Sequence, residues 1–127
     1  MFKRNPAKSA AISTLIGAHT TVQGDLQFAG GCHVDGRVVG NVTTAAGAEA
    51  FLSVSEQGAI EGSVKVAHVL LNGLVNGDIL ARDRVELGPK ARVMGNVQYG
   101  IIEMALGAEI NGKLIHLAPG KADDAKL

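Results

Sequence analysis

Six copies of one five-residue pattern dominate this chain of 127 residues. The pattern is a branched aliphatic residue, any residue, glycine, any residue and a second branched aliphatic residue. The position after glycine is usually Asp, Asn or Ser, and the central glycines are 16, 22, 15, 18 and 17 residues apart. These glycines are Gly24, Gly40, Gly62, Gly77, Gly95 and Gly112. A repeat of this kind indicates units that stack on their neighbours, because no single unit can bury its apolar face alone.

The spacing predicts an all-β chain that forms a parallel β-helix of about six coils, with roughly 17 residues and three short strands per coil. Such a unit is too short for a helix pair or a propeller blade. Alternation with a period of two places the aliphatic residues and the glycine on the inward face of a strand. Glycine is then needed where the wall turns or another backbone comes close. Six coils at the ~4.8 Å strand spacing give a rod of roughly 29 Å.

Two features of the repeat are less regular. The long interval lies within 43–56 and requires either additional loop residues or a shifted register, and its alanine-rich part, 45–50, suits a short helical turn or a loop. An apolar residue followed by glycine precedes several copies, as in Ile16-Gly17, Leu87-Gly88 and Leu106-Gly107. No long segment keeps a helical period, so helices are expected to be nearly absent.

The repeat shows no convincing cap at either end. It begins at Thr14 and ends at Leu117, just before Pro119. Uncapped coils expose backbone hydrogen-bonding groups and apolar side chains, which favours end-to-end self-assembly. We expect one domain at 14–118, with short flexible tails at 1–13 and 119–127. The expected polymerisation interface is Leu15, Ile16, Val22, Leu26 and Phe28 at one end, and Ile102, Met104, Leu106, Ile110, Leu114, Ile115 and Leu117 at the other.

The segment from Thr14 to Val42, TLIGAHTTVQGDLQFAGGCHVDGRVVGNV, resembles the opening of a bactofilin domain. The later V-M-G-N-V and I-N-G-K-L turns fit the same family, and the resemblance covers about 14–118. It implies a right-handed β-helix that polymerises without nucleotide into non-polar filaments, joined head-to-head and tail-to-tail. It also implies a bacterial cytoskeletal role, often at the inner membrane, in cell shape or cell-wall synthesis, with cell-wall enzymes as partners.

The N-terminal tail and the overall charge bear on location. Met1, Phe2, Lys3, Arg4 and Lys8 combine an aromatic ring with cations, which suits weak attachment to an anionic membrane surface, although a solvated tail has the same composition. Bactofilins often begin with a similar membrane-targeting segment. The chain has no apolar run of signal-peptide or transmembrane length, and its 12 basic and 12 acidic residues leave no net charge to attract nucleic acid. We expect a cytoplasmic protein that is peripheral at the inner face of the membrane.

Two other classes of protein fit parts of the pattern. One is an enzyme on a left-handed β-helix, such as a hexapeptide-repeat acyltransferase or a γ-class carbonic anhydrase. Ile16, Val22, Phe28 and Val34 are six residues apart as that fold requires, but the period fails at Gly40. The other is a monomeric binding module with a partner on one flat face.

Residues able to carry chemistry form no recognisable site. The histidines have no metal-ligand spacing and suit hydrogen-bonded surface or corner positions, and the single Cys32 suits the core because no base accompanies it. The Asp and Asn residues beside the glycines suit turns, through side-chain hydrogen bonds and tolerance of left-handed backbone. No segment has the Gly-Lys-Ser/Thr ending of a phosphate loop. No catalytic residue, metal or cofactor is therefore assigned, and we expect a structural protein that is not an enzyme.

Overall fold

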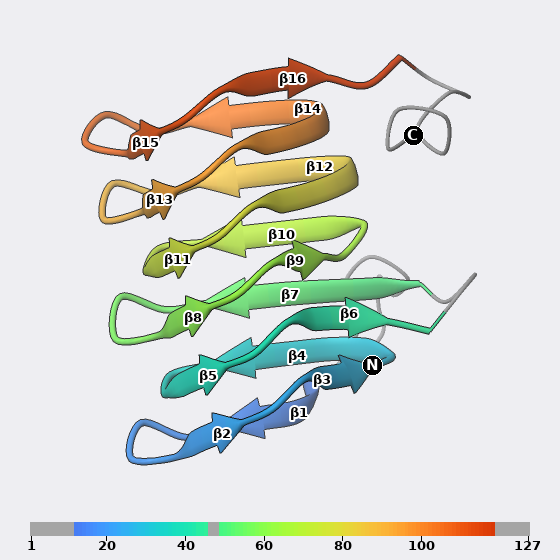
Figure 1. Ribbon diagram of the computed structural model, residues 1–127, viewed down its shortest axis with the longest axis vertical. Helices are drawn as coiled ribbons and strands as arrows, with labels where there is room; N and C mark the ends of the chain where they lie inside the picture. Colours follow the sequence, from blue (N-terminus) through green and yellow to red (C-terminus); the bar gives the residue numbers. More distant parts are fainter. Residues whose placement is uncertain (1–11, 46–48, 119–127) are drawn as a thin grey trace, which may run out of the picture.

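The computed structural model describes 12–45 and 49–118, which form a parallel β-solenoid of six coils (Figure 1). Each coil contributes one strand to each of three faces, and strands of successive coils pair in parallel. No helix occurs within these described residues. The predicted all-β solenoid with three short strands per coil is confirmed. Coil 1 is 12–29, coil 2 is 30–49, coil 3 is 50–67, coil 4 is 68–83, coil 5 is 84–100 and coil 6 is 101–117.

The three faces are stacks of equivalent strands. The first face contains β1 (Ile12–Ile16), β4 (Gly30–Val34), β7 (Ala50–Val54), β10 (His68–Leu71) and the second halves of β12 (Ile79–Leu87) and β14 (Val97–Met104). The second face contains β2 (Thr21–Gln23), β5 (Arg37–Val39), β8 (Ala59–Glu61), β11 (Leu74–Asn76), β13 (Arg92–Met94) and β15 (Glu109–Asn111). The third face contains β3 (Leu26–Phe28), β6 (Val42–Thr44), β9 (Val64–Lys65), the first halves of β12 and β14, and β16 (Leu114–His116). Because β12 and β14 run from the third face into the first, these two faces form one ten-stranded sheet, and the second face is a separate six-stranded sheet.

The interior is a set of apolar columns in which like residues lie above like residues. On the second face Val38, Ile60, Val75 and Val93 pair in direct succession, and none of these side chains is accessible to solvent. Alternate residues of each short strand point inward, so branched side chains fill a narrow core. Full burial of one such side chain contributes about 1.5–3 kcal/mol. No charged or polar side chain is fully buried in the part of the chain that the structure describes.

The glycine of the repeated pattern lies at the corner between the second and third faces. Strand β2 ends at Gln23 and β3 begins at Leu26, so Gly24 lies between two strands. The prediction that this glycine lies on the inward face of a single strand is therefore wrong. Its close approach to another backbone is confirmed, because a Cβ on Gly62 would overlap the carbonyl oxygen of Gly40 in the preceding coil. The φ angle of Gly62, +152°, is also one that other residues rarely adopt.

The residue after each of these glycines belongs to a second column, which we call the corner ladder: Asp25, Asn41, Ser63, Asp78, Asn96 and Lys113. The backbone N–H of Asn41 donates to Oδ1 of Asp25 at 2.9 Å, and that of Ser63 donates to Oδ1 of Asn41 at 3.0 Å. The same bond links Asn96 to Asp78 at 2.9 Å and Lys113 to Asn96 at 3.0 Å. These side chains thus accept hydrogen bonds at the corner, but the bonds join successive coils and do not close a turn as predicted. The predicted use of left-handed backbone is wrong, since no described residue other than glycine has a positive φ.

The long interval in the repeat consists of real additional residues. Val38 pairs directly with Ile60, so the register is correct and the alternative of a shifted register is excluded. The extra residues lie between β6, which ends at Thr44, and β7, which begins at Ala50. Ala45 and Glu49 are not helical, whereas 46–48 lie outside the described residues. The additional residues therefore lie between the third and first faces, and the strands on either side of them still pair with the neighbouring coils.

Replacement of Gly62 by alanine is expected to lower the midpoint of thermal unfolding by several degrees. The new methyl group overlaps backbone that moves only if two coils part, and such overpacking costs about 1–3 kcal/mol before the unfavourable φ is added. Circular dichroism melts of Gly62→Ala and of the control Gly17→Ala measure the effect, since the nearest atom to a Cβ on Gly17 is 3.7 Å away. Equal midpoints for the two variants would show that the glycine column does not fix the stacking.

Candidate polymerisation interface

Coil 6 exposes apolar side chains in positions that the preceding coils bury. Met104 pairs with the buried Leu87, and Leu114 pairs with the buried Val97. Met104 and Leu114 point inward as Leu87 and Val97 do, but Met104 is 46% exposed and Leu114 is 47% exposed. The equally inward Ile102 and Ile110 are partly buried against the core, and Leu117 is buried. The C-terminal end of the solenoid is thus a cross-section of the core that is open to solvent.

Two further residues expected at this interface lie elsewhere on coil 6. Leu106 lies in the corner between the first and second faces and is 96% exposed. Because Met104 is the partner of Leu87, Leu106-Gly107 is not equivalent to Leu87-Gly88 as the sequence suggested. Ile115 alternates with the inward Leu114 and pairs with Gln98, so it points outward from the third face. Leu106 therefore belongs to the rim of the open end, and Ile115 to the side of the rod.

The first coil presents the other group of expected residues. Ile16 and Phe28 are buried, and Val22 and Leu26 are partly buried against the core. Leu15 is 62% exposed because it points outward from the first face, in the column of His33. In Figure 1 β1, β2 and β3 lie at one end of the long axis and β15 and β16 at the other. The two groups of residues therefore cannot meet within one molecule and can meet only between molecules.

Three residues that the pattern did not single out also mark the ends. Ile12 and Ile101 are about half exposed, and they were missed because they lie beside the inward positions. Lys113 occupies the place in the corner ladder where the earlier coils have Asp, Asn or Ser. An ammonium group only donates hydrogen bonds, so Lys113 offers no side-chain acceptor to a further coil. The sequence shows this difference, because Lys113 in the sixth copy is the one basic residue that follows a repeated glycine.

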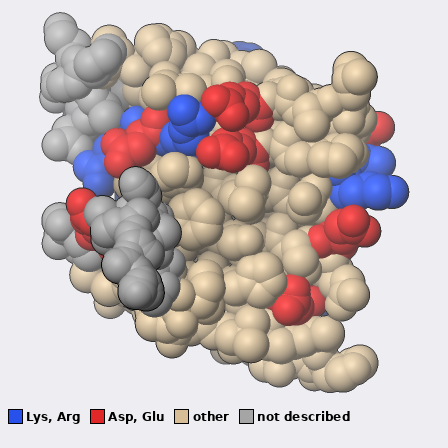
Figure 2. All heavy atoms as spheres, turned by 180° about the vertical axis from the view of Figure 1, so that it is seen from behind, with Lys and Arg blue, Asp and Glu red and all other residues tan. Residues whose placement is uncertain are grey.

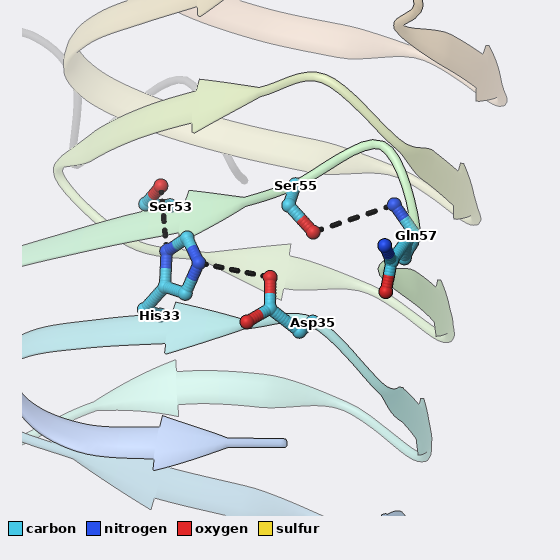
Figure 3. Close-up of polar contacts among 5 residues, drawn as sticks. All are labelled: His33, Asp35, Ser53, Ser55 and Gln57. Carbon is cyan, nitrogen blue, oxygen red and sulfur yellow. Dashed lines mark hydrogen bonds and ion pairs between the residues drawn. The ribbon is translucent and has the colours of Figure 1, made fainter. Parts of the chain in front are cut away.

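On the first face His33 links two coils through its ring (Figure 3). Nε2 lies 2.9 Å from Oδ1 of Asp35, and Nδ1 lies 3.1 Å from Oγ of Ser53 in the next coil. A side-chain hydrogen bond from Ser55 lowers the pKa of Asp35; partial desolvation opposes this, and the charge and hydrogen bond of His33 add to it. Ser55 Oγ also accepts the backbone N–H of Gln57. This polar network braces coil 2 against coil 3.

The residue types of this network are those of a catalytic triad, but the setting is different. Acyl transfer requires free N–H donors beside the nucleophile to hold the oxyanion. Ser53 and His33 are themselves paired residues of β7 and β4, within a continuous parallel ladder. The backbone there is engaged in strand pairing, and His33 is hydrogen-bonded at the surface, as expected.

The outer charges are interspersed by sign rather than gathered. Arg84 NH1 lies 2.6 Å from Glu103 Oε2, Arg92 lies 3.6 Å from Glu109, and Arg37 pairs with Glu61. Figure 2 shows acidic and basic side chains next to one another near the C-terminal end of the rod. Among the residues described, no group of three or more His, Cys, Asp or Glu is placed to hold a metal ion. The same part of the chain has no helix with the length and apolarity to span a bilayer.

Comparisons with known proteins agree with this architecture. The family model for bactofilins, described as polymer-forming cytoskeletal, matches residues 14–115. Bactofilin BacO of Myxococcus xanthus is 28% identical over 102 residues, which cover 80% of this chain and 78% of that protein. Bactofilin BacP of the same organism is 28% identical over 112 residues; the match covers 88% of this chain and 45% of BacP, so this chain spans less than half of that relative.

A solved structure is similar as well. The cryo-EM reconstruction of Thermus thermophilus bactofilin double helical filaments matches with a TM-score of 0.73 and 30% sequence identity, covering 81% of this chain and 98% of that chain. The fold and these matches define a polymer-forming cytoskeletal β-solenoid. The chain belongs to the bactofilin family.

The reactivity of the Cys32 thiol reports on the packing of the core. Burial makes its side chain inaccessible and raises its pKa to about 11. We expect the native thiol to resist a maleimide at pH 8, where it remains protonated, and to react rapidly once urea unfolds the chain. Intact-mass measurement of the label with and without urea gives the comparison. Rapid labelling of the folded protein would contradict the position of Cys32 in the core.

Proposed function

We propose that this chain polymerises end to end into non-polar filaments that require no nucleotide, and that these filaments form a scaffold at the inner face of the cytoplasmic membrane. The observation that carries the proposal is the open end of coil 6, where Met104 and Leu114 are about half exposed although Leu87 and Val97 are buried one coil earlier. A coil from a second molecule would cover these side chains as coil 6 covers coil 5. The proposed role is structural and involves no catalysis.

The contacts proposed between molecules are of the kind that hold the coils together within one. Each described coil pairs with its neighbour through parallel strands on all three faces, and the end coils lack one such neighbour. Strand addition at an open edge supplies backbone hydrogen bonds, and burial of apolar side chains supplies affinity. Neither contribution depends on a bound nucleotide. The double helical filaments of the Thermus thermophilus relative support polymerisation as the function.

The strength of one joint is modest. Covering the exposed halves of Met104 and Leu114 contributes about 1 kcal/mol each, which is half of the ~1.5–3 kcal/mol for full burial of such a side chain. Association costs about 4–15 kcal/mol in lost freedom, so backbone pairing and the rest of the coil must contribute too. Assembly is therefore expected to depend steeply on concentration.

We further propose that like ends meet, head to head and tail to tail. A two-fold joint places the same surface on both partners, which closes without a polar direction along the filament. The corner ladder supports this arrangement, because Asp25, Asn41, Asp78 and Asn96 each accept a hydrogen bond from the next coil, whereas Lys113 has no acceptor to offer. Coil 1 of another molecule, stacked in the ordinary parallel sense on coil 6, would find no side-chain partner at this corner.

Attachment to the membrane is proposed to use Met1, Phe2, Lys3, Arg4 and Lys8, which lie outside the described residues. Each basic residue near an anionic surface contributes about 1 kcal/mol, so a single tail binds weakly. A filament displays many tails, and multivalency then makes the attachment firm. Such a scaffold would concentrate cell-wall enzymes where the cell is shaped, with the protein cytoplasmic and peripheral.

The purified protein is expected to form long fibres without added nucleotide, as seen by negative-stain electron microscopy. Leu114→Asp is expected to give only short soluble species, because the joint then buries an unpaired charge. The control is Gln57→Asp, which places the same charge at an exposed corner of coil 3. Fibres of wild-type length from Leu114→Asp would contradict the choice of coil 6 as a joint.

Deletion of Met1 to Lys8 is expected to abolish co-sedimentation of fibres with anionic liposomes while leaving fibre formation intact. Replacing Lys3, Arg4 and Lys8 by glutamine, with Phe2 retained, separates the electrostatic contribution and should weaken binding most at low salt. Neutral liposomes are the matched control. If the deleted protein still sediments with anionic liposomes to the same extent, the tail is not the membrane-binding element.

A further inference from the structure

The two ends of the rod differ in the solvent exposure of apolar side chains that occupy equivalent columns. The inference drawn from this difference rests on the filament proposed above. Ile16 and Met104 occupy the same inward column of the first face, yet Ile16 is 8% exposed and Met104 is 46% exposed. On the third face Leu26 is partly buried, whereas Leu114 in the same column is 47% exposed. The open end of coil 6 therefore offers more uncovered apolar surface than the end of coil 1.

The corner between the first and second faces shows the same difference. Counted from Ile16 and from Met104, Ala18 in coil 1 corresponds to Leu106 in coil 6. Leu106 is 96% exposed, and a leucine buries far more apolar surface than an alanine when it is covered. The rim of coil 6 thus adds a large apolar side chain where the rim of coil 1 has a small one.

Charge does not separate the two ends. In coil 1 the described residues include one charged side chain, Asp25, so a joint between two copies of coil 1 brings two carboxylates into one interface. Coil 6 carries Glu103 and Glu109, which pair with Arg84 and Arg92 of coil 5, and Lys113, so a joint between two copies of coil 6 brings two ammonium groups together. The two ends therefore differ in their uncovered apolar surface and not in electrostatic balance.

From these observations we propose that the two joints of the filament are unequal, and that the unit of assembly is a two-fold dimer joined through coil 6. The occupant of the coil 6 end is coil 6 of a second copy. A coil contains 17 residues or so, whereas a stable interface takes about 20–30 residues from each side. Both the coil 1 joint and the coil 6 joint therefore lie near the limit of stability. The additional apolar surface of coil 6 makes its joint the one that dissociates at the lower protein concentration.

The experiment is a dilution series of the full chain by mass photometry or sedimentation velocity. The wild-type fibres are expected to dissociate into dimers before monomers appear. The variants come in two pairs at equivalent positions, Leu26→Asp with Leu114→Asp and Ala18→Glu with Leu106→Glu. The coil 1 variants are expected to give discrete dimers. The coil 6 variants are expected to dissociate into monomers at concentrations at least tenfold higher than those at which the coil 1 variants do so.

The second pair keeps the test free of folding effects, because Leu106 and Ala18 are both exposed and circular dichroism should show no change in either variant. Equal dissociation constants for the coil 1 and coil 6 variants, or dimers that persist only in the coil 6 variants, would overturn the inference and leave filament formation untouched. A wild-type protein that is monomeric at every concentration would contradict filament formation itself, and this inference with it.

Discussion

Close backbone contact between the glycines of successive coils sets the geometry of the whole molecule. Where Gly40, Gly62 and Gly77 stack, a Cβ on each would overlap the carbonyl oxygen of the glycine one coil earlier. That approach brings the coils to strand-pairing distance at the corner, and the adjoining strands of the second and third faces then pair in register. The valine and isoleucine columns of the core and the hydrogen bonds of the corner ladder follow from the same spacing. A side chain in the glycine column would therefore disturb every other contact at that level of the rod.

The stacking of coils that stabilises the monomer also leaves uncovered apolar surface at its ends, where another molecule can bind. An interior coil is covered above and below, so Val38, Ile60 and Val75 are inaccessible to solvent, whereas coil 6 leaves Leu114 half exposed. The sides of the rod differ from the ends because their backbone groups are already paired and their charges alternate in sign. Affinity is thereby concentrated along the axis, which is the direction in which a filament must grow. The function proposed for this bactofilin thus requires no separate binding device beyond an uncovered cross-section of the core.

The number of coils, the strands per coil and the inward aliphatic residues of the second and third faces could be predicted because like residues lie above like residues, so the period of the sequence is the period of the structure. Local bends were harder to predict. Gly24 was assigned to a strand because the inward spacing of Val22 and Leu26 is the same across a corner as along a strand. Leu106 was aligned with Leu87 because an apolar residue precedes a glycine in both places, although Gly88 is the first residue of its corner and Gly107 is the third. The bond between His33 and Ser53 was not predictable, since coils of unequal length bring together residues that no fixed period relates.

If molecules join by continuing the stack of coils, the strands lie perpendicular to the fibre axis across every joint. X-ray diffraction from aligned fibres of the purified protein measures this orientation. We expect a strong reflection at ~4.8 Å along the fibre axis, because paired strands then repeat along the fibre as they do within one molecule. A ~4.8 Å reflection perpendicular to the fibre axis, or a ~4.8 Å ring with no preferred direction, would show that the molecules associate through their sides and not through their ends.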